Sequence, residues 1–159
     1  MSETDERRVR EILAAVKPLA AEYYRLTGKP LGVTGEVAEY VAAEILGLEL
    51  APPRTHGYDA IRRTQDGPQR IQIKGRAYGK DAKPGQRLGT IKRGAPCDAV
   101  LFVLLDNSTL EPREMWEALI ADVEERLSLP GKAHERGALG VREFKRLARQ
   151  VWPQAIVDA

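Results

Sequence analysis

The fold is decided by residues 57–75, GYDAIRRTQDGPQRIQIKG, and by the apolar run AVLFVLL at residues 99–105. Within the first stretch, residues 57–63 and 69–75 have the pattern of two strands, and residues 64–68 have the composition of a turn between them. The second stretch contains no polar residue, which predicts a central strand that is covered on both faces. Together they predict a hairpin in the same sheet as a buried strand.

The length of the hairpin loop decides which side chains share a face of the sheet. A two-residue loop at Gln65-Asp66 places Asp59 opposite Gln72, and one at Asp66-Gly67 places Asp59 opposite Lys74. In both cases the side chains of Asp59, Gln72 and Lys74 lie on one face, whereas a three-residue loop turns Asp59 to the other face. An aspartate and an amide oxygen can hold a hard cation, and a lysine beside them can stabilise a phosphate.

The elements on either side of this hairpin predict the fold class. Apolar residues recur at helical spacing over residues 5–27, where Pro18 either kinks or divides the helix. The sequence as a whole predicts a single domain over residues 1–159, of the α/β (α+β) class, with a mixed β-sheet flanked by helices. The remaining elements we expect are a helix at 35–47, short strands at 48–51 and 110–117, a helix or turn at 122–127 and a final helix at 140–152.

A basic segment, residues 76–97, joins the hairpin to the apolar strand, and its glycines and prolines predict irregular structure. Residues 74–93 hold seven basic residues and one acid, although the formal net charge of the chain is only +2. Concentrated positive charge attracts a phosphate backbone, and the alternative is a solvated loop face. The side chains expected to contact DNA are Arg76, Lys80, Lys83, Arg87, Lys92 and Arg93, together with His56 just before the hairpin.

Asp59 followed by Gln72-Ile73-Lys74, with Glu36 near the start of the preceding helix, resembles the PD-(D/E)XK nuclease superfamily. That superfamily includes restriction endonucleases and Holliday-junction resolvases. The resemblance covers residues 33–106 and implies a restriction-endonuclease-like fold around a nuclease core. It implies that Asp59, Gln72, the Ile73 carbonyl and Glu36 hold Mg²⁺ or Mn²⁺, and that Lys74 is the catalytic lysine.

Two positions depart from the pattern of the superfamily. Tyr58 stands where a proline often precedes the aspartate, and Gln72 replaces the usual glutamate, as in a methylation-dependent restriction branch. Gln72 removes one negative charge from the site, which predicts weaker ion binding. Glu39 and Glu44 are further acids on the helix of Glu36, but only Glu36 follows a glycine as in the superfamily.

Two functions therefore stay open. The first is a metal-dependent endonuclease that hydrolyses phosphodiester bonds in DNA. The second is a catalytically inactive restriction-endonuclease-like domain that acts as a nucleic-acid-binding or protein-interaction module. Binding that depends steeply on salt and not on Mg²⁺ would favour the second function.

Composition excludes several other classes. Hydrophobic residues make up 43% and charged residues 30%, which is the balance of a soluble globular protein. No apolar run reaches the length of a membrane span, and the acidic N-terminus lacks the apolar region of a secretory signal, so we expect a cytoplasmic protein. Cys97 is the only cysteine, which excludes an intrachain disulfide. Charge alternates between residues 74–93, 111–126 and 132–149, and this alternation would permit a head-to-tail homodimer.

Overall fold

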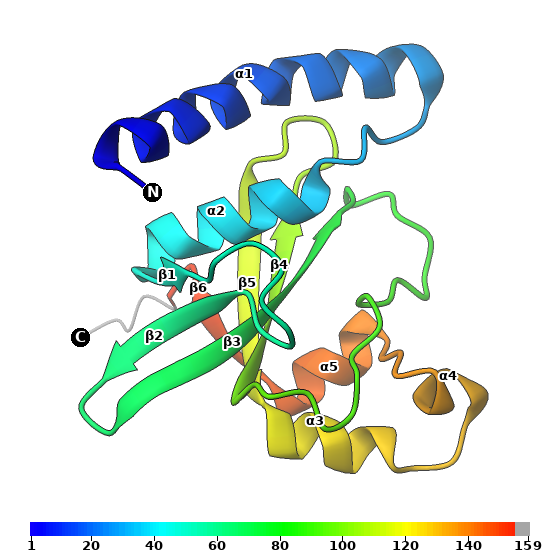
Figure 1. Cartoon of the computed structure of the whole chain (residues 1–159). Coiled ribbons are helices and arrows are strands. Elements are labelled where there is room, and N and C mark those ends of the chain that lie inside the picture. The colour runs from blue at the N-terminus through cyan, green and yellow to red at the C-terminus, as the bar shows by residue number, and fades with distance from the viewer. Residues whose placement is uncertain (155–159) are drawn as a thin grey trace, which may run out of the picture.

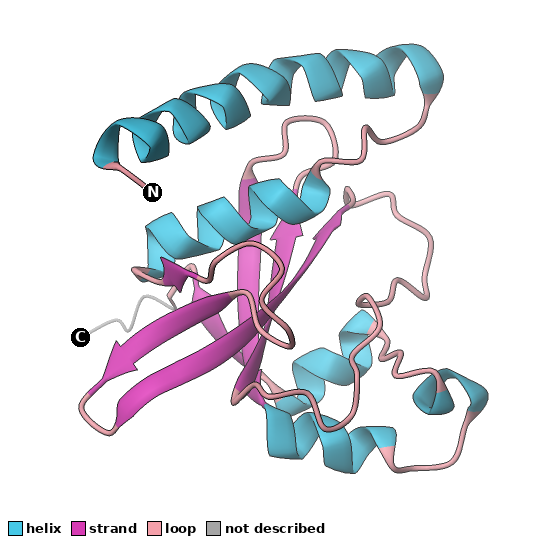
Figure 2. Cartoon of the chain, in the orientation of Figure 1, coloured by secondary structure: helices cyan, strands magenta, loops and turns pink. Residues whose placement is uncertain are grey.

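A six-stranded mixed sheet with helices on both faces forms the body of the protein in the computed structural model, which describes residues 1–154 (Figures 1 and 2). The strands follow one another across the sheet in chain order. Only β3 and β4 are parallel, and all other neighbours are antiparallel. The predicted α+β class with a mixed sheet is confirmed. The strands are β1 (Glu49–Leu50), β2 (Ala60–Thr64), β3 (Gly67–Ala77), β4 (Ala99–Leu105), β5 (Pro112–Leu119) and β6 (Arg149–Trp152).

The β2–β3 hairpin closes with the two-residue loop Gln65-Asp66, because Thr64 pairs with Gly67. The same register pairs Ala60 with Ile71. The paired register ends at Ala60, and the Asp59 N–H donates to the Ile71 carbonyl at 2.8 Å, so the predicted pairing of Asp59 with Gln72 lies just outside the paired residues. Asp59 itself lies just before β2, because the strand begins three residues later than the predicted range of 57–63.

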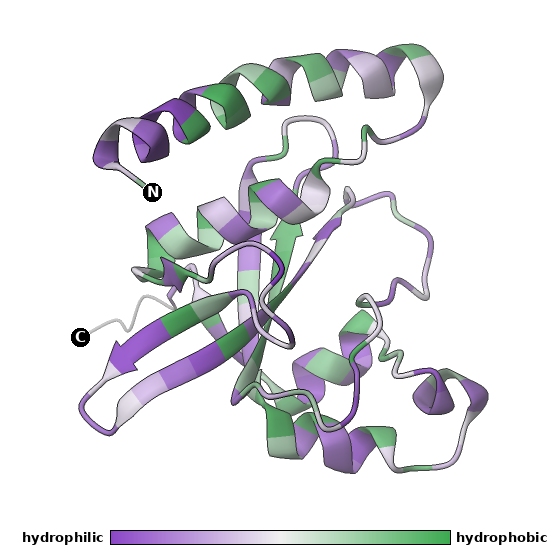
Figure 3. Ribbon diagram, in the orientation of Figure 1, coloured by the Kyte–Doolittle hydropathy of each residue, from purple (hydrophilic) through white to green (hydrophobic). Residues whose placement is uncertain are grey.

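All seven residues of β4 are buried, and the strand is apolar along its length in Figure 3. Leu101 and Val103 pack in a core beneath α1 (Glu3–Thr27) and α2 (Thr34–Leu46). Val100 and Phe102 pack on the opposite face with α3 (Ile120–Leu127) and α5 (Val141–Leu147). The prediction of a central strand covered on both faces is confirmed.

α1 runs over the sheet as one undivided helix, with Pro18 inside it. Ser2 and Asp5 form a capping box at its start, and Gly28 ends it in the left-handed conformation with a φ of 69°. Pro18 is exposed, so the ring meets solvent and not the core. The alternative of a divided helix is excluded. None of the helices within the described residues is long and apolar enough to cross a bilayer.

The predicted final helix at 140–152 is wrong over its second half. α5 ends at Leu147, and Arg149–Trp152 forms β6 along the outer edge of β5. The helical spacing of Val141, Phe144 and Val151 is misleading here, because Val151 packs in the core on the other face of the sheet. Pairing with the free edge of β5 outweighs the local helical pattern. A short helix that the sequence did not predict, α4 (Lys132–Glu135), precedes α5.

The basic segment at residues 76–97 is irregular as predicted, but its second half is held in place. Leu88 and Ile91 are buried, at 2% and 1% exposure. The Leu88 N–H donates to the Leu139 carbonyl at 3.0 Å, and the Ile91 N–H donates to the Gly137 carbonyl at 2.9 Å. The C-terminal part of the chain thereby fixes this segment against the sheet face that carries Gln72 and Lys74.

Candidate active site

The edge of β3 that faces β2 is unpaired beyond Ile71, because the two strands are antiparallel and β2 does not extend that far. β2 begins at Ala60 opposite Ile71, whereas β3 continues to Ala77. Asp59 caps this edge: its Oδ2 accepts a hydrogen bond from the Ile73 N–H at 2.7 Å. Its backbone is fixed on both sides, because its N–H donates to the Ile71 carbonyl and its carbonyl accepts from the Ala51 N–H, both at 2.8 Å. The Asp59 carboxylate is therefore held at the point where the two strands separate.

β3 carries two further oxygen atoms next to this hydrogen bond in the chain, Oε1 of Gln72 and the carbonyl oxygen of Ile73. Gln72 Oε1 is buried and accepts no hydrogen bond within the part of the chain that the structure describes. An orphaned buried acceptor of this kind costs about 1–3 kcal/mol, so it calls for an explanation. The Ile73 carbonyl leaves the strand on the same side as its N–H, and therefore on the side of Asp59. A carboxylate, an amide oxygen and a backbone carbonyl are the donors that hard divalent cations prefer.

Lys74 lies on the same face as Gln72 and is half-buried. Burial lowers the pKa of its ammonium, and the nearby Asp59 charge raises it. No ion pair joins Lys74 to Asp59 among residues 1–154, because no nitrogen–oxygen contact of 4.0 Å or less links them. The ammonium is thus near the carboxylate and is free to contact a bound anion.

Glu39 of α2 is the acid that the structure brings into this group. Burial, the charge of Asp59 and the charge of Glu36 together raise the pKa of Glu39 to about 7. Glu36 is exposed one helical turn earlier, at the outer rim of the same cluster. The resemblance implied Glu36 as the ligand and left Glu39 as a further acid. Their spacing of three residues was the signal that both share one helix face.

Replacing Glu39 with glutamine is expected to stabilise the metal-free protein at alkaline pH. The raised pKa means that the folded state binds this proton more tightly than the unfolded state, whose pKa is near the ordinary 4.5. Wild type therefore loses stability as the pH rises from about 4.5 through about 7, and the glutamine variant does not. Because the carboxylate is partly screened by solvent, we expect a gain of roughly 1–2 kcal/mol at about pH 8 and none at about pH 4.

Urea denaturation of both proteins at the two pH values measures this difference. Glu44→Gln is the matched control, since Glu44 is exposed on the same helix and should change little at either pH. An equal gain from Glu44→Gln, or a gain from Glu39→Gln that does not vary with pH, would contradict the prediction.

Basic side chains lie near Lys74 on the side that faces the segment at residues 86–93. A β-carbon on Gly89 would lie 3.6 Å from Lys74 Cδ and 3.8 Å from Arg76 Nη2, so this glycine lets the anchored segment pass close to both side chains. Arg76 Nε donates to the Arg87 carbonyl at 2.7 Å. The charge of Lys92 contributes to the lowered pKa of Lys74. The site is therefore acidic toward α2 and cationic toward the segment at residues 86–93.

The other predicted phosphate contacts are spread more widely. Lys80 and Lys83 are exposed in the first half of the basic segment, near the end of β3. The Arg93 guanidinium donates to the Leu127 carbonyl and so turns toward the end of α3. His56 is exposed in the loop that leads to Asp59. Of the six basic residues predicted to contact DNA, Arg76 and Lys92 lie close enough for their charges to lower the pKa of Lys74, and the Arg87 carbonyl accepts a hydrogen bond from Arg76.

Comparisons with known proteins identify no relative: no protein-family model matches the chain, and a search of curated proteins finds no match. Within residues 1–154, no three His, Cys, Asp or Glu side chains are gathered closely enough to hold a metal ion by themselves. A metal site at the open edge of β3 would therefore depend on the Gln72 amide and the Ile73 carbonyl as well as on Asp59.

Proposed function

We propose that this protein is a divalent-metal-dependent nuclease of the restriction-endonuclease-like class, which hydrolyses phosphodiester bonds in DNA. The observation that carries the proposal is the open edge of β3. There the carboxylate of Asp59 accepts from the Ile73 N–H, and the two chain neighbours of Ile73 are Gln72, whose buried Oε1 has no partner among residues 1–154, and the half-buried Lys74. The resemblance of residues 33–106 to the PD-(D/E)XK superfamily supports the same function.

The donor set fits Mg²⁺ or Mn²⁺. Asp59, Gln72 and the Ile73 carbonyl would hold the ion, with Glu39 or Glu36 reaching it from α2. A cation bound there would polarise a phosphate oxygen and lower the pKa of a water molecule. It would also give Gln72 Oε1 the partner that it lacks.

Basic side chains would stabilise the transition state and bind the neighbouring phosphates. The Lys74 ammonium would stabilise the negative charge that builds on the phosphate oxygens as water attacks the phosphorus. Arg76, Arg87 and Lys92 would bind the phosphates on either side of the scissile bond. Because these cations lie on one side of β3 and the carboxylates on the other, the DNA backbone would approach from the segment at residues 86–93.

The test compares wild type with Asp59→Asn. The asparagine can still accept the hydrogen bond from the Ile73 N–H, so the hairpin is expected to fold, but the ligand charge is lost. We expect Mg²⁺ affinity, measured by calorimetry, to fall at least about tenfold, and cleavage of plasmid and single-stranded DNA to fall with it. Asp66→Asn is the matched control, because Asp66 is exposed in the hairpin loop. Cleavage that survives in Asp59→Asn would overturn the proposal.

A second function, nucleic-acid binding without catalysis, is favoured by one observation. Gln72 stands where the superfamily has an acid, and the described residues gather no third carboxylate or other ionisable ligand at the metal position. In that case DNA binding would be lost with rising salt and would be the same with and without Mg²⁺. The calorimetry above separates the two functions, since a binding module would show no Mg²⁺ isotherm.

A further inference from the structure

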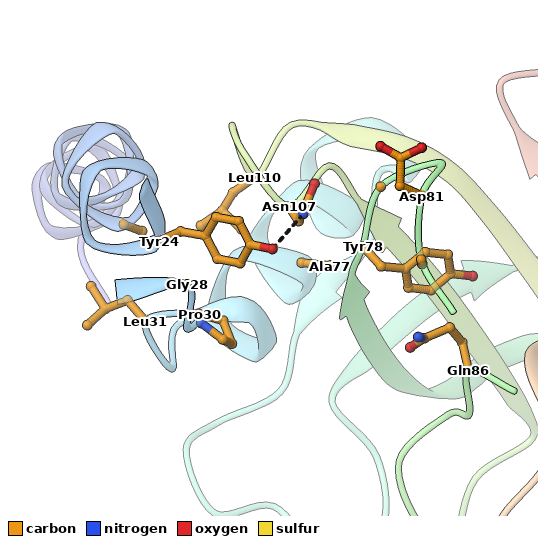
Figure 4. A pocket seen from close by; sticks show the side chains of 13 residues that line it. Tyr24, Gly28, Pro30, Leu31, Ala77, Tyr78, Asp81, Gln86, Asn107 and Leu110 are labelled. Atoms are coloured by element: carbon orange, nitrogen blue, oxygen red, sulfur yellow. Dashed lines mark hydrogen bonds between the residues drawn. The ribbon is translucent and has the colours of Figure 1, made fainter. Parts of the chain in front are cut away.

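A hollow of about 470 Å³ lies where β3 ends, beyond the candidate active site (Figure 4). Its walls come from the last turns of α1, the chain that follows α1, the loop after β3 and the turn between β4 and β5. β3 and β4 are parallel, so their carboxyl ends meet at this point. Crevices at the carboxyl ends of parallel strands are frequent ligand sites.

The walls combine aromatic rings with uncharged and acidic polar groups. Tyr24 and Tyr78 stand on opposite sides of the hollow in Figure 4. Asn107 lies between them and donates from Nδ2 to the Tyr24 hydroxyl at 3.3 Å. Asp81 and Gln86 lie beside Tyr78. Tyrosine faces stack on flat rings, and the amides and carboxylate accept hydrogen bonds from amino groups.

The charges of the residues that line the hollow limit the class of ligand that it can bind. Among residues 1–154, no lysine, arginine or histidine side chain lines the hollow, and Asp81 is the one carboxylate in its lining. A phosphate or carboxylate would therefore find no cation inside. Lys80 and Lys83, the neighbours of Asp81 and Ala82 in the chain, are exposed outside it. An uncharged ring inside and a phosphate outside would match this distribution of charge.

We propose that the hollow binds an unstacked nucleobase that carries an exocyclic amino group, taken from the strand bound at Lys74; as a DNA subsite it rests on the proposed function. Tyr78 lies four residues after Lys74 on the same run of chain, which at about 3.3 Å per residue is roughly 13 Å. A strand that advances about 3.4 Å per nucleotide covers this distance in about four nucleotides. The base would stack on Tyr24 or Tyr78 and donate its amino group to Asp81, Asn107 or Gln86.

This subsite would make the enzyme prefer DNA in which one base is free to leave the stack. Extrusion of a paired base costs a few kcal/mol, and the cost is least where the base is mismatched or single-stranded. The preference would be for adenine, cytosine or guanine over thymine, because thymine has no amino group to donate.

The test is a titration of the protein with deoxyadenosine and with thymidine, followed by amide chemical shifts in NMR spectra. We expect deoxyadenosine to shift the signals of Tyr24, Tyr78 and Asn107, and thymidine to bind more weakly. Tyr24→Leu, which removes a stacking face, is expected to weaken deoxyadenosine binding roughly tenfold. Asp81→Lys tests the same site without touching the core, since Asp81 is exposed. Tyr23→Leu is the matched control, because Tyr23 is exposed on another face of α1.

The outcomes separate this inference from the proposed function. Deoxyadenosine binding that weakens in Tyr24→Leu and Asp81→Lys but not in Tyr23→Leu supports the subsite, and it should persist in Asp59→Asn. Absence of shifts in the wall residues, or equal binding in all variants, overturns the subsite even if Mg²⁺-dependent cleavage is found. Binding of a simple alkylammonium ion in place of the nucleosides also overturns it.

Discussion

On the proposed nuclease function, replacement of Lys74 by methionine is expected to lower the rate of Mg²⁺-dependent DNA cleavage by roughly 100- to 1,000-fold, because it would remove a preorganised cation from the reacting phosphate. The same change should not destabilise the protein. Burial lowers the pKa of Lys74, which means that folding penalises its charged form. Methionine keeps the length of the side chain without that penalty. We therefore expect the free energy of unfolding at neutral pH to be unchanged or higher.

Single-turnover cleavage and urea denaturation measure the two effects on the same preparations. Lys92→Met is the matched control, since Lys92 is exposed on the neighbouring segment. Its loss should weaken DNA binding and reduce the salt dependence of binding, with little effect on the cleavage rate of bound DNA. A Lys74→Met variant that cleaves at the wild-type rate would falsify the role given to this lysine.

A single methyl group at Gly57 is expected to destabilise the protein and to disable the site together. The φ of Gly57 is +89°, and a β-carbon there would lie 2.3 Å from Cδ of Pro96. The positive φ costs an alanine about 1–2 kcal/mol, and the rigid proline ring adds a packing cost of about 1–3 kcal/mol. Asp59 follows two residues later, so relief of the clash would move its carboxylate away from Ile73. We expect Gly57→Ala to lose about 2–5 kcal/mol of stability and, on the proposed function, most of its Mg²⁺ affinity.

The variant Gly85→Ala separates the cost of the positive φ from the cost of the clash with Pro96. Gly85 has nearly the same φ, +92°, but no atom lies within 4 Å of the position of its β-carbon. It should therefore show only the cost of the backbone conformation, about 1–2 kcal/mol, and keep its Mg²⁺ affinity. Denaturation curves and calorimetry on the two variants decide the matter. Equal losses of stability would mean that the contact with Pro96 contributes nothing.

The hairpin and the central strand could be predicted from the sequence because their signals are local. The sequence allowed a two-residue loop at Gln65-Asp66 or at Asp66-Gly67, and the first of these closes the hairpin and sets its register. The apolar run at residues 99–105 has only one environment that suits it, between two cores. The central part of the fold and its most distinctive residues therefore follow from short stretches of chain.

The parts that could not be predicted depend on distant contacts. Arg149–Trp152 becomes a strand because β5 offers an unpaired edge, which no pattern within those residues reveals. Glu39 gains its raised pKa first from burial and then from the charge of Asp59, which lies twenty residues later in the chain. The hollow beside Tyr24 and Tyr78 unites the end of α1 with residues more than fifty positions later. Residue spacing could place Glu36 and Glu39 on one helix face, but it could not place Glu39 near Asp59 or reveal the hollow.

The hydrogen bonds between residues 86–91 and residues 137–141 also affect when the protein can complete its folding during translation. The cationic side of the site rests on Leu88 and Ile91, whose backbone partners Leu139 and Gly137 are made much later during translation. Domains fold as their chains emerge, at about 5–20 residues per second. The cationic side of the site therefore cannot be anchored on the ribosome before residues 137–141 have emerged, some seconds after residues 86–91. On the proposed function, a nascent chain would lack its anchored DNA-binding segment until residues 137–141 had been made.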